Sequence, residues 1–155
     1  YNTPQQIVIS GSMDGLDWVS AAVEKQGAKV IPLNVSIANH SPLVEGAVDD
    51  FAGVIDSVHF DTPRSTVYFN ITAEPEDDPS RIKQMMARQI VSRVRWYEII
   101  SAMLSAGVDT FVEVGPKTVL KGMMRKIVPK GVKVTTLQFD SPESLNTCLE
   151  KLNLG

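Results

Sequence analysis

The sequence has few cysteine and histidine residues and no long apolar run. It contains one cysteine, Cys148, and two histidines in 155 residues. An internal disulfide is therefore impossible, and we expect a reducing, cytoplasmic location. We expect no metal site, because a lone histidine does not hold a metal and the single cysteine is far away in a predicted helix. No apolar run approaches the ~20 residues of a membrane span, so we expect no contact with a membrane.

The chain also has no excess of positive charge, since 15 basic residues face 18 acidic ones and the formal net charge is −3. A general nucleic-acid binder is usually basic, so we expect no nucleic-acid partner. What remains is ordinary globular composition, with 43% hydrophobic and 21% charged residues. The chain begins at Tyr1 and not at methionine, which raises the possibility that it is part of a longer protein.

Strand-forming and helix-forming segments alternate along the chain and predict an α/β fold. The first segments form a β-α-β pattern, with strands at 5–10 and 29–37 around a helix that Ser12 or Asp14 would cap. Two strands and one helix bury too little surface to be stable alone, so this unit needs neighbours. Later in the sequence, the pattern predicts strands at 66–71, 110–114 and 132–138, and helices at 43–58, 82–90, 96–106, 118–128 and from 141 onward.

The candidate chemical groups are few. His40 lies between a predicted strand and a predicted helix, at the edge where open α/β sheets place their sites; it could be a general base or a structural histidine. His59 follows an apolar run and suits the surface. The segment 11–15 resembles a nucleophile elbow, but Ser12 stands one position too early and is better explained as a helix cap. The residues thus offer a possible base without a nucleophile.

Four segments in a fixed order resemble one family. They are Asn-Thr-Pro-Gln-Gln-Ile-Val-Ile-Ser-Gly (2–11), Asn-His-Ser-Pro-Leu-Val (39–44), Arg-Gln-Ile-Val-Ser-Arg-Val-Arg-Trp (88–96) and Phe-Val-Glu-Val-Gly-Pro-Lys-Thr-Val-Leu (111–120). Together they resemble the C-terminal half of the malonyl-CoA:acyl carrier protein transacylases and of related acyltransferase domains. The resemblance covers essentially the whole chain.

The resemblance implies a particular division of the fold. Residues 1–37 would be the second half of a ferredoxin-like small subdomain. Residues 38–155 would be the C-terminal part of an α/β-hydrolase-like large subdomain. The family's Gly-His-Ser-x-Gly elbow, which carries the nucleophilic serine, would lie in an N-terminal half that this chain lacks, so we expect the chain alone to be inactive.

The resemblance also implies a reaction. Malonyl would pass from malonyl-CoA to a serine and then to the phosphopantetheine thiol of acyl carrier protein, as in fatty acid biosynthesis, with no permanently bound cofactor. His40 would be the general base and acid, and the backbone carbonyl of Gln89 would orient it. Asn2 and Gln6 would lie near the cleft. Asn39 precedes the histidine, where side-chain size is associated with the choice of acyl group, which the sequence leaves open together with the oligomeric state.

Six basic residues and no acidic ones occur between 117 and 133. They could form a solvated helix face, or they could steer the acidic acyl carrier protein onto the enzyme. In the second case the docking residues would be Lys117, Lys121, Arg125 and Lys126. Two other interpretations of the whole chain stay open: an acyltransferase domain of a polyketide synthase, and a non-catalytic α/β binding module.

Overall fold

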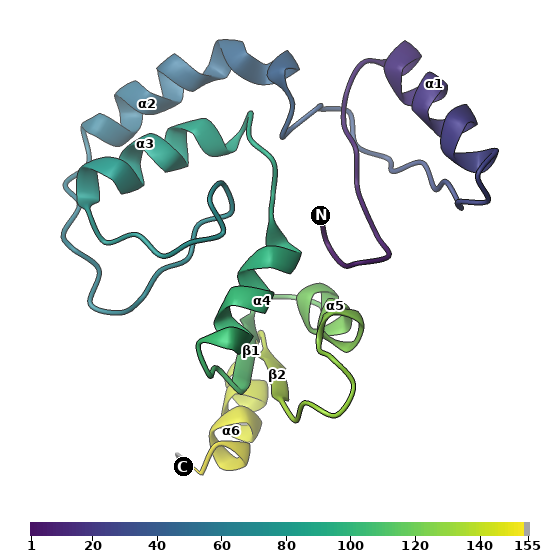
Figure 1. Ribbon diagram of the computed structural model, residues 1–155. Helices are drawn as coiled ribbons and strands as arrows, with labels where there is room; N and C mark the ends of the chain where they lie inside the picture. Colours follow the sequence, from purple (N-terminus) through teal and green to yellow (C-terminus); the bar gives the residue numbers. More distant parts are fainter. Residues whose placement is uncertain (154–155) are drawn as a thin grey trace. The chain divides into compact units, whose positions relative to one another are not determined.

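A computed structural model describes residues 1–153 and shows two compact units. One unit combines Tyr1–Ile7 with the chain from Trp96 onward, and the other is Val8–Arg95. Helices and a small parallel sheet make up the regular structure (Figure 1), which confirms the α/β prediction at the level of fold class. No helix among the described residues is both long and apolar enough to cross a lipid bilayer.

The unit that contains the C-terminal segment is built around two parallel strands. Strands β1 (Thr110–Val114) and β2 (Thr135–Phe139) pair in register, with helix α5 (Val119–Ile127) as the crossover between them. Parallel strands require such a long connection, because a tight hairpin reverses the chain direction. Helices α4 (Trp96–Ser105) and α6 (Pro142–Lys151) complete this unit (Figure 1).

The core of this unit lies between α4 and α5. Ile100 of α4 packs with Met124 and Ile127 of α5, and all three side chains are almost fully buried. Met124 and Ile127 are three residues apart, so they share one face of the helix. Burying each such side chain contributes about 1.5–3 kcal/mol. The sheet itself is thereby held against this pair of helices through Phe111.

In the second unit, the regular structure is helical. It contains α1 (Met13–Glu24), the 3-10 helix η1 (Pro42–Ala47), α2 (Val48–Asp56) and α3 (Pro79–Gln89). Helices α2 and α3 lie side by side and bury Val48, Ile55, Ile82 and Ala87 (Figure 1). The helix predicted at 43–58 is therefore present, but its first part is a 3-10 turn that begins at a proline.

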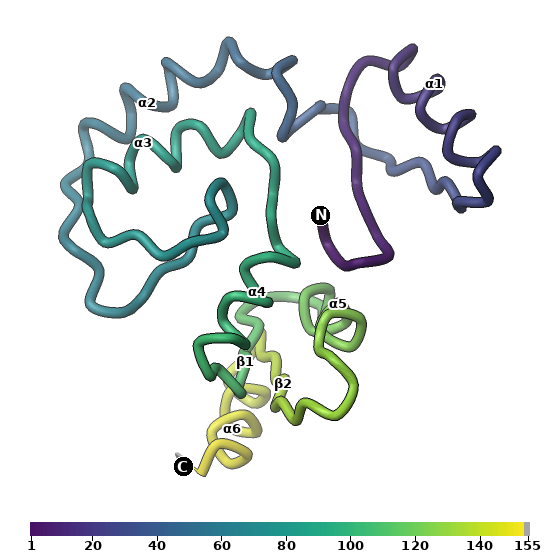
Figure 2. The backbone as a smooth tube through the Cα atoms, viewed as in Figure 1, coloured from purple at the N-terminus to yellow at the C-terminus, as the bar shows by residue number. Residues whose placement is uncertain are grey.

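Three of the predicted strands are wrong as regular structure. The segments 5–10 and 29–37 lie on either side of α1 along the chain (Figure 2). Among the described residues neither forms a strand ladder, and Gln6 makes an isolated bridge with Thr3. The segment 66–71 has only an isolated bridge, between Tyr68 and Pro75. β-Propensity favours extended backbone, but a strand also needs a neighbour to accept and donate its hydrogen bonds. The apolar side chains of the first two segments are consequently exposed, Ile7, Val8, Ile9, Ile31, Leu33, Val35 and Ile37 among them.

Candidate active site around His40

His40 has an unusual backbone conformation. It lies in the turn just before η1 and has φ = 63°, in the left-handed region. Non-glycine residues are uncommon there, although histidine is enriched relative to most, and the conformation costs on the order of 1–3 kcal/mol. The His40 N–H donates to the carbonyl of Ile90 over 2.7 Å, which anchors the strained residue to the end of α3.

The imidazole ring of His40 also contacts the end of α3 and the turn that follows it. Its Nδ1 lies 3.0 Å from the carbonyl oxygen of Gln89 and 3.1 Å from that of Ser92. Carbonyl oxygens only accept hydrogen bonds, so Nδ1 must be the protonated nitrogen of the neutral ring. The lone pair then resides on Nε2, the arrangement that a general base requires. His40 is exposed, so Nε2 is accessible to a reactant.

The end of α3 explains why carbonyl groups converge on His40. Gln89 is the last residue of the helix, and the carbonyls of a last helical turn have no partner within the helix. A turn follows, in which Ser92 N–H donates to the Gln89 carbonyl over 3.2 Å. The Gln89 side-chain amide donates to the Ser92 carbonyl over 3.5 Å. The Gln89 carbonyl therefore contacts His40 directly, and the Gln89 side chain helps to position the Ser92 carbonyl, which is the second contact of the ring.

Two serine hydroxyls hold the other side of the His40 turn. Ser10 Oγ donates to the carbonyl of Asn39 over 2.5 Å. Ser41 Oγ donates to the carbonyl of Ala38 over 2.7 Å and accepts the N–H of Leu43 over 3.3 Å. The side chain of Asn39 contributes no hydrogen bond to this network, and the residue is exposed.

The residues predicted near a cleft, Asn2 and Gln6, lie in the other compact unit. The N–H groups of Asn2 and Thr3 both donate to the Gln6 carbonyl, over 3.1 and 3.2 Å. Gln6 also lines a hollow of about 210 Å³ with Val119, Gly122, Met123 and Lys126. Lys126, one of the predicted docking residues, therefore shares a surface with a predicted cleft residue.

The other predicted docking residues lie at the beginning of α5 and along it. Lys117 precedes the helix with φ = 69°, Lys121 is half-buried and Arg125 is exposed. Within the part of the chain that the structure describes, no ion pair engages these residues or Lys126. Their positive charge is thus available to an acidic surface.

The helix start beside these residues is held by Glu113 of β1. Its carboxylate accepts the N–H of Leu120 over 3.0 Å and that of Lys121 over 2.9 Å. A carboxylate at this position satisfies two unpaired donors and faces the positive end of the helix dipole. Thr118, the residue at the cap position, makes no side-chain capping bond, so the capping contact comes from the strand.

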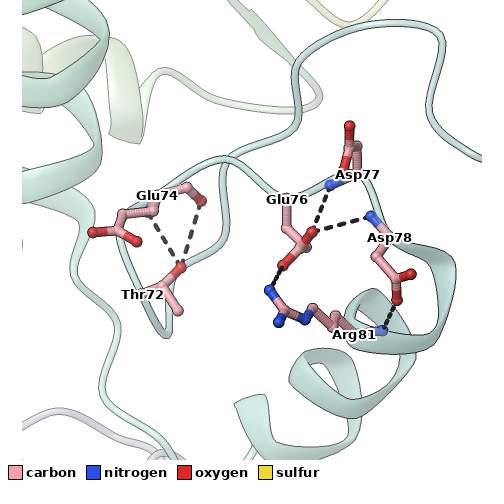
Figure 3. Close-up of polar contacts among 6 residues, drawn as sticks. All are labelled: Thr72, Glu74, Glu76, Asp77, Asp78 and Arg81. Atoms are coloured by element: carbon pink, nitrogen blue, oxygen red, sulfur yellow. Dashed lines mark hydrogen bonds and ion pairs between the residues drawn. The ribbon is translucent and has the colours of Figure 1, made fainter.

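His59 and the acidic loop take no part in a site of this kind. The His59 side chain is 86% exposed, and its Nε2 lies 3.1 Å from Oδ1 of the exposed Asp61. In the acidic loop, Asp78 caps α3 and Glu76 Oε1 accepts the N–H groups of Asp77 and Asp78 (Figure 3). Across residues 1–153, no three or more histidine, cysteine or acidic side chains gather as metal ligands.

Sequence reasoning missed two participants near His40. The Ser92 carbonyl was missed because it reaches the ring only through the conformation of the turn after α3. Ser41 had a recognisable signal: a serine directly before a proline is a typical helix start, with the serine as cap and the proline in the first turn. The structure shows that this cap also closes the His40 turn.

The structure shows an α/β protein in which two backbone carbonyls orient an exposed histidine. Comparison with known proteins identifies its family. Residues 1–139 match the family model described as "Acyl transferase domain". The chain therefore belongs to the acyl transferase domain family. This confirms the resemblance seen in the sequence.

The relatives indicate a more particular group. The chain is 33% identical over 152 residues to the malonyl CoA-acyl carrier protein transacylase of Bacillus subtilis (strain 168), covering 97% of this chain and 47% of the relative. It is 35% identical to MCAT from Streptococcus pneumoniae, with a TM-score of 0.88 and coverage of 97% and 48%. A malonyl-transacylase solved in complex with a type II PKS acyl-carrier protein has a TM-score of 0.90 at 31% identity, again with 97% and 48% coverage. The chain thus spans about half the length of these relatives.

Proposed function

We propose that the protein containing this chain transfers malonyl from malonyl-CoA to the phosphopantetheine thiol of acyl carrier protein through an acyl-serine intermediate. His40 is the general base and acid in this proposal, and the carbonyl of Gln89 orients it. The observation that carries the proposal is the pair of carbonyls, 3.0 and 3.1 Å from Nδ1, which leave Nε2 as the proton acceptor.

The proposed chemistry needs one proton acceptor that works in both directions. In the first half-reaction, Nε2 of His40 takes the hydroxyl proton as the serine oxygen attacks the thioester carbon. The carbon–sulfur bond then breaks, and the imidazolium returns the proton to the leaving thiolate of coenzyme A. In the second half-reaction, the same steps run with the carrier thiol as the attacking group. Coenzyme A enters as part of the substrate, and the scheme uses no permanently bound cofactor.

The names of the relatives support the substrates in this proposal. The Bacillus subtilis relative is a malonyl CoA-acyl carrier protein transacylase, and another relative was solved with an acyl-carrier protein. From the resemblance of its motifs to this family, we assign Asn2, Gln6 and Asn39 to the substrate cleft. From the positive charge between residues 117 and 133, we assign Lys117, Lys121, Arg125 and Lys126 to the docking of the carrier protein.

The proposal includes a second portion of the protein that supplies the serine. In the complete protein, residues 1–37 would belong to a ferredoxin-like small subdomain and residues 38–155 to an α/β-hydrolase-like one. The exposed apolar side chains of 5–10 and 29–37 fit this assignment, because apolar strand residues on either face of a sheet need cover. Amide hydrogen exchange of both segments in the complete protein should show protection; rapid exchange throughout would contradict the subdomain assignment.

The function is tested by replacing the base. His40→Ala in the complete protein should slow malonyl loading of the serine by a factor of about 10²–10⁴, the usual contribution of a general base. Intact-protein mass spectrometry after rapid mixing with malonyl-CoA measures this rate directly. His59→Ala is the matched control, because it removes the other imidazole of the chain, and it should load normally. Near-normal loading by His40→Ala would refute the assigned role.

A further inference from the structure

We propose that Ser41 is a positioning residue for His40, and that its buried hydroxyl holds the turn on which the histidine is carried. This inference rests on the proposed function, because it assumes that the orientation of His40 matters for proton transfer. Ser41 contributes no atom to the reaction. It acts on the backbone on both sides of His40.

The hydrogen bonds of Ser41 are placed to enclose His40. Its Oγ donates backward to the carbonyl of Ala38 over 2.7 Å and accepts forward from the N–H of Leu43 over 3.3 Å. Asn39 and His40 lie inside the loop that the first bond closes. Ser41 is only 6% exposed, whereas its neighbours Asn39 and His40 are exposed. The buried hydroxyl of Ser41 therefore holds the exposed turn that contains Asn39 and His40.

The strained backbone explains why such a lock is needed. With φ = 63°, His40 would relax toward the right-handed or extended region if its flanks were released. Rotation about the N–Cα bond of His40 would move the ring and change the contacts of Nδ1 with the Gln89 and Ser92 carbonyls. The bond between His40 N–H and Ile90 anchors the residue itself, while Ser41 fixes the residues on each side.

The consequence is kinetic, not a matter of substrate binding. A displacement of a reacting group by about 1 Å is enough to cost roughly 100-fold in rate. Ser41→Ala should therefore reduce the kcat of serine loading about 10- to 100-fold, with the KM for malonyl-CoA unchanged. Ser57→Ala is the matched control: Ser57 Oγ also donates to the carbonyl three residues earlier, Val54, over 2.6 Å. This control should load at the normal rate.

A second pair of variants separates the hydroxyl from the shape of the side chain. Thr and Val have nearly the same shape, and both suit the extended backbone of Ser41, at φ −135° and ψ 161°. Ser41→Thr should retain most of the loading rate, and Ser41→Val should lose it to the same degree as Ser41→Ala. Equal rates for the Thr and Val variants would overturn the proposal. Because Val fills the site, this comparison holds even if the Ala variant fails to fold.

The double variant shows whether Ser41 acts through His40. If it does, His40→Ala/Ser41→Ala should load no more slowly than His40→Ala, because residues that act as a unit are not additive. A further multiplicative loss would overturn the proposal. The possible failures are distinguishable: no malonyl loading by the wild-type complete protein refutes the function, and normal loading by His40→Ala refutes the base role of His40. Slow loading by His40→Ala together with normal loading by Ser41→Ala refutes only the positioning role of Ser41.

Discussion

His40 combines backbone strain with three hydrogen bonds to the turn at the end of α3. The backbone N–H bonds to Ile90, and the ring Nδ1–H faces the carbonyls of Gln89 and Ser92. A net contribution of about 1 kcal/mol per hydrogen bond is comparable to the cost of the left-handed conformation. The turn at the end of α3 therefore both stabilises the strained backbone of His40 and orients its ring.

A second residue-scale consequence concerns Glu76 and pH. The backbone N–H of Asp78, and then that of Asp77, hold the pKa of Glu76 below its usual 4.5, with a smaller contribution from Arg81. A carboxylate with a lowered pKa stabilises the folded state above pH 4.5, and this contribution is lost as the pH falls through the folded pKa. Glu76→Gln should therefore lower the urea midpoint near neutral pH, and the difference from wild type should shrink in acid.

Glu74 provides the control for this prediction. It lies in the same loop, and its hydrogen bonds with the Thr72 hydroxyl use only the backbone N–H and carbonyl of Glu74 and not its carboxylate (Figure 3). Glu74→Gln makes the same change of charge and should leave the urea midpoint nearly constant at both pH values. A Glu76→Gln difference that stays constant into acid would show that the backbone contacts of the carboxylate are not responsible.

Sequence reasoning could predict some residue contacts and not others. The resemblance predicted that the Gln89 carbonyl would meet His40, and the structure places them 3.0 Å apart. It could not predict the Ser92 carbonyl or the bond from Ser10 to Asn39. These contacts join segments that are far apart in sequence, by 52 residues for Ser92 and His40 and by 29 residues for Ser10 and Asn39. Side-chain periodicity carries no such information.

At the scale of elements, helices were predictable because their ends carry local signals. The helix starts at Ser12, Asp78 and Ser141 all have a capping side chain bonded to the first turn. Strand 110–114 was predicted with its observed limits, and the strand predicted at 132–138 begins three residues later, at Thr135. The segments 5–10, 29–37 and 66–71 have strand composition but no ladder, because pairing depends on distant backbone and not on local sequence.

Glu113 gives a test at this scale, because it connects β1 to α5. Removing its carboxylate leaves the N–H groups of Leu120 and Lys121 without their partner. Losing a helix cap typically costs about 1 kcal/mol, so Glu113→Ala should lower the free energy of unfolding by about 1–2 kcal/mol. Glu113→Gln keeps one acceptor oxygen, so its free energy of unfolding should lie between those of Glu113→Ala and the wild type. Urea unfolding followed by circular dichroism measures both.

Glu150 offers the comparison for Glu113. It is an exposed carboxylate on α6 whose side chain makes no hydrogen bond within the described part of the chain. Glu150→Ala changes the net charge equally and should have little effect on unfolding. If the Glu113 and Glu150 variants lose the same stability, capping by Glu113 is not the cause.

At the scale of the whole molecule, charge is distributed unevenly. The net charge is −3, yet the stretch from 117 to 133 carries six positive charges and no negative one. On α5, Met124 and Ile127 face the core while Arg125 and Lys126 are exposed. The helix therefore separates an apolar inner face from a basic outer one. Such a surface accelerates encounters with acidic partners in a salt-dependent way.

The docking role that we propose for this surface predicts an asymmetry between the two half-reactions. Lys121 and Arg125 are four residues apart on α5, so Lys121→Glu/Arg125→Glu reverses two charges on one stretch of the helix. At low salt, transfer of malonyl to acyl carrier protein should slow about tenfold or more. Loading from malonyl-CoA should be unchanged, and added salt should bring the transfer rates of variant and wild type closer together.

The control variant is Lys25→Glu/Lys29→Glu. It changes the net charge by the same amount, but in the N-terminal half of the chain, and it should affect neither half-reaction. Equal slowing of both half-reactions by the α5 variant would contradict docking. Both half-reactions use the same catalytic groups, whereas only the second uses the carrier protein.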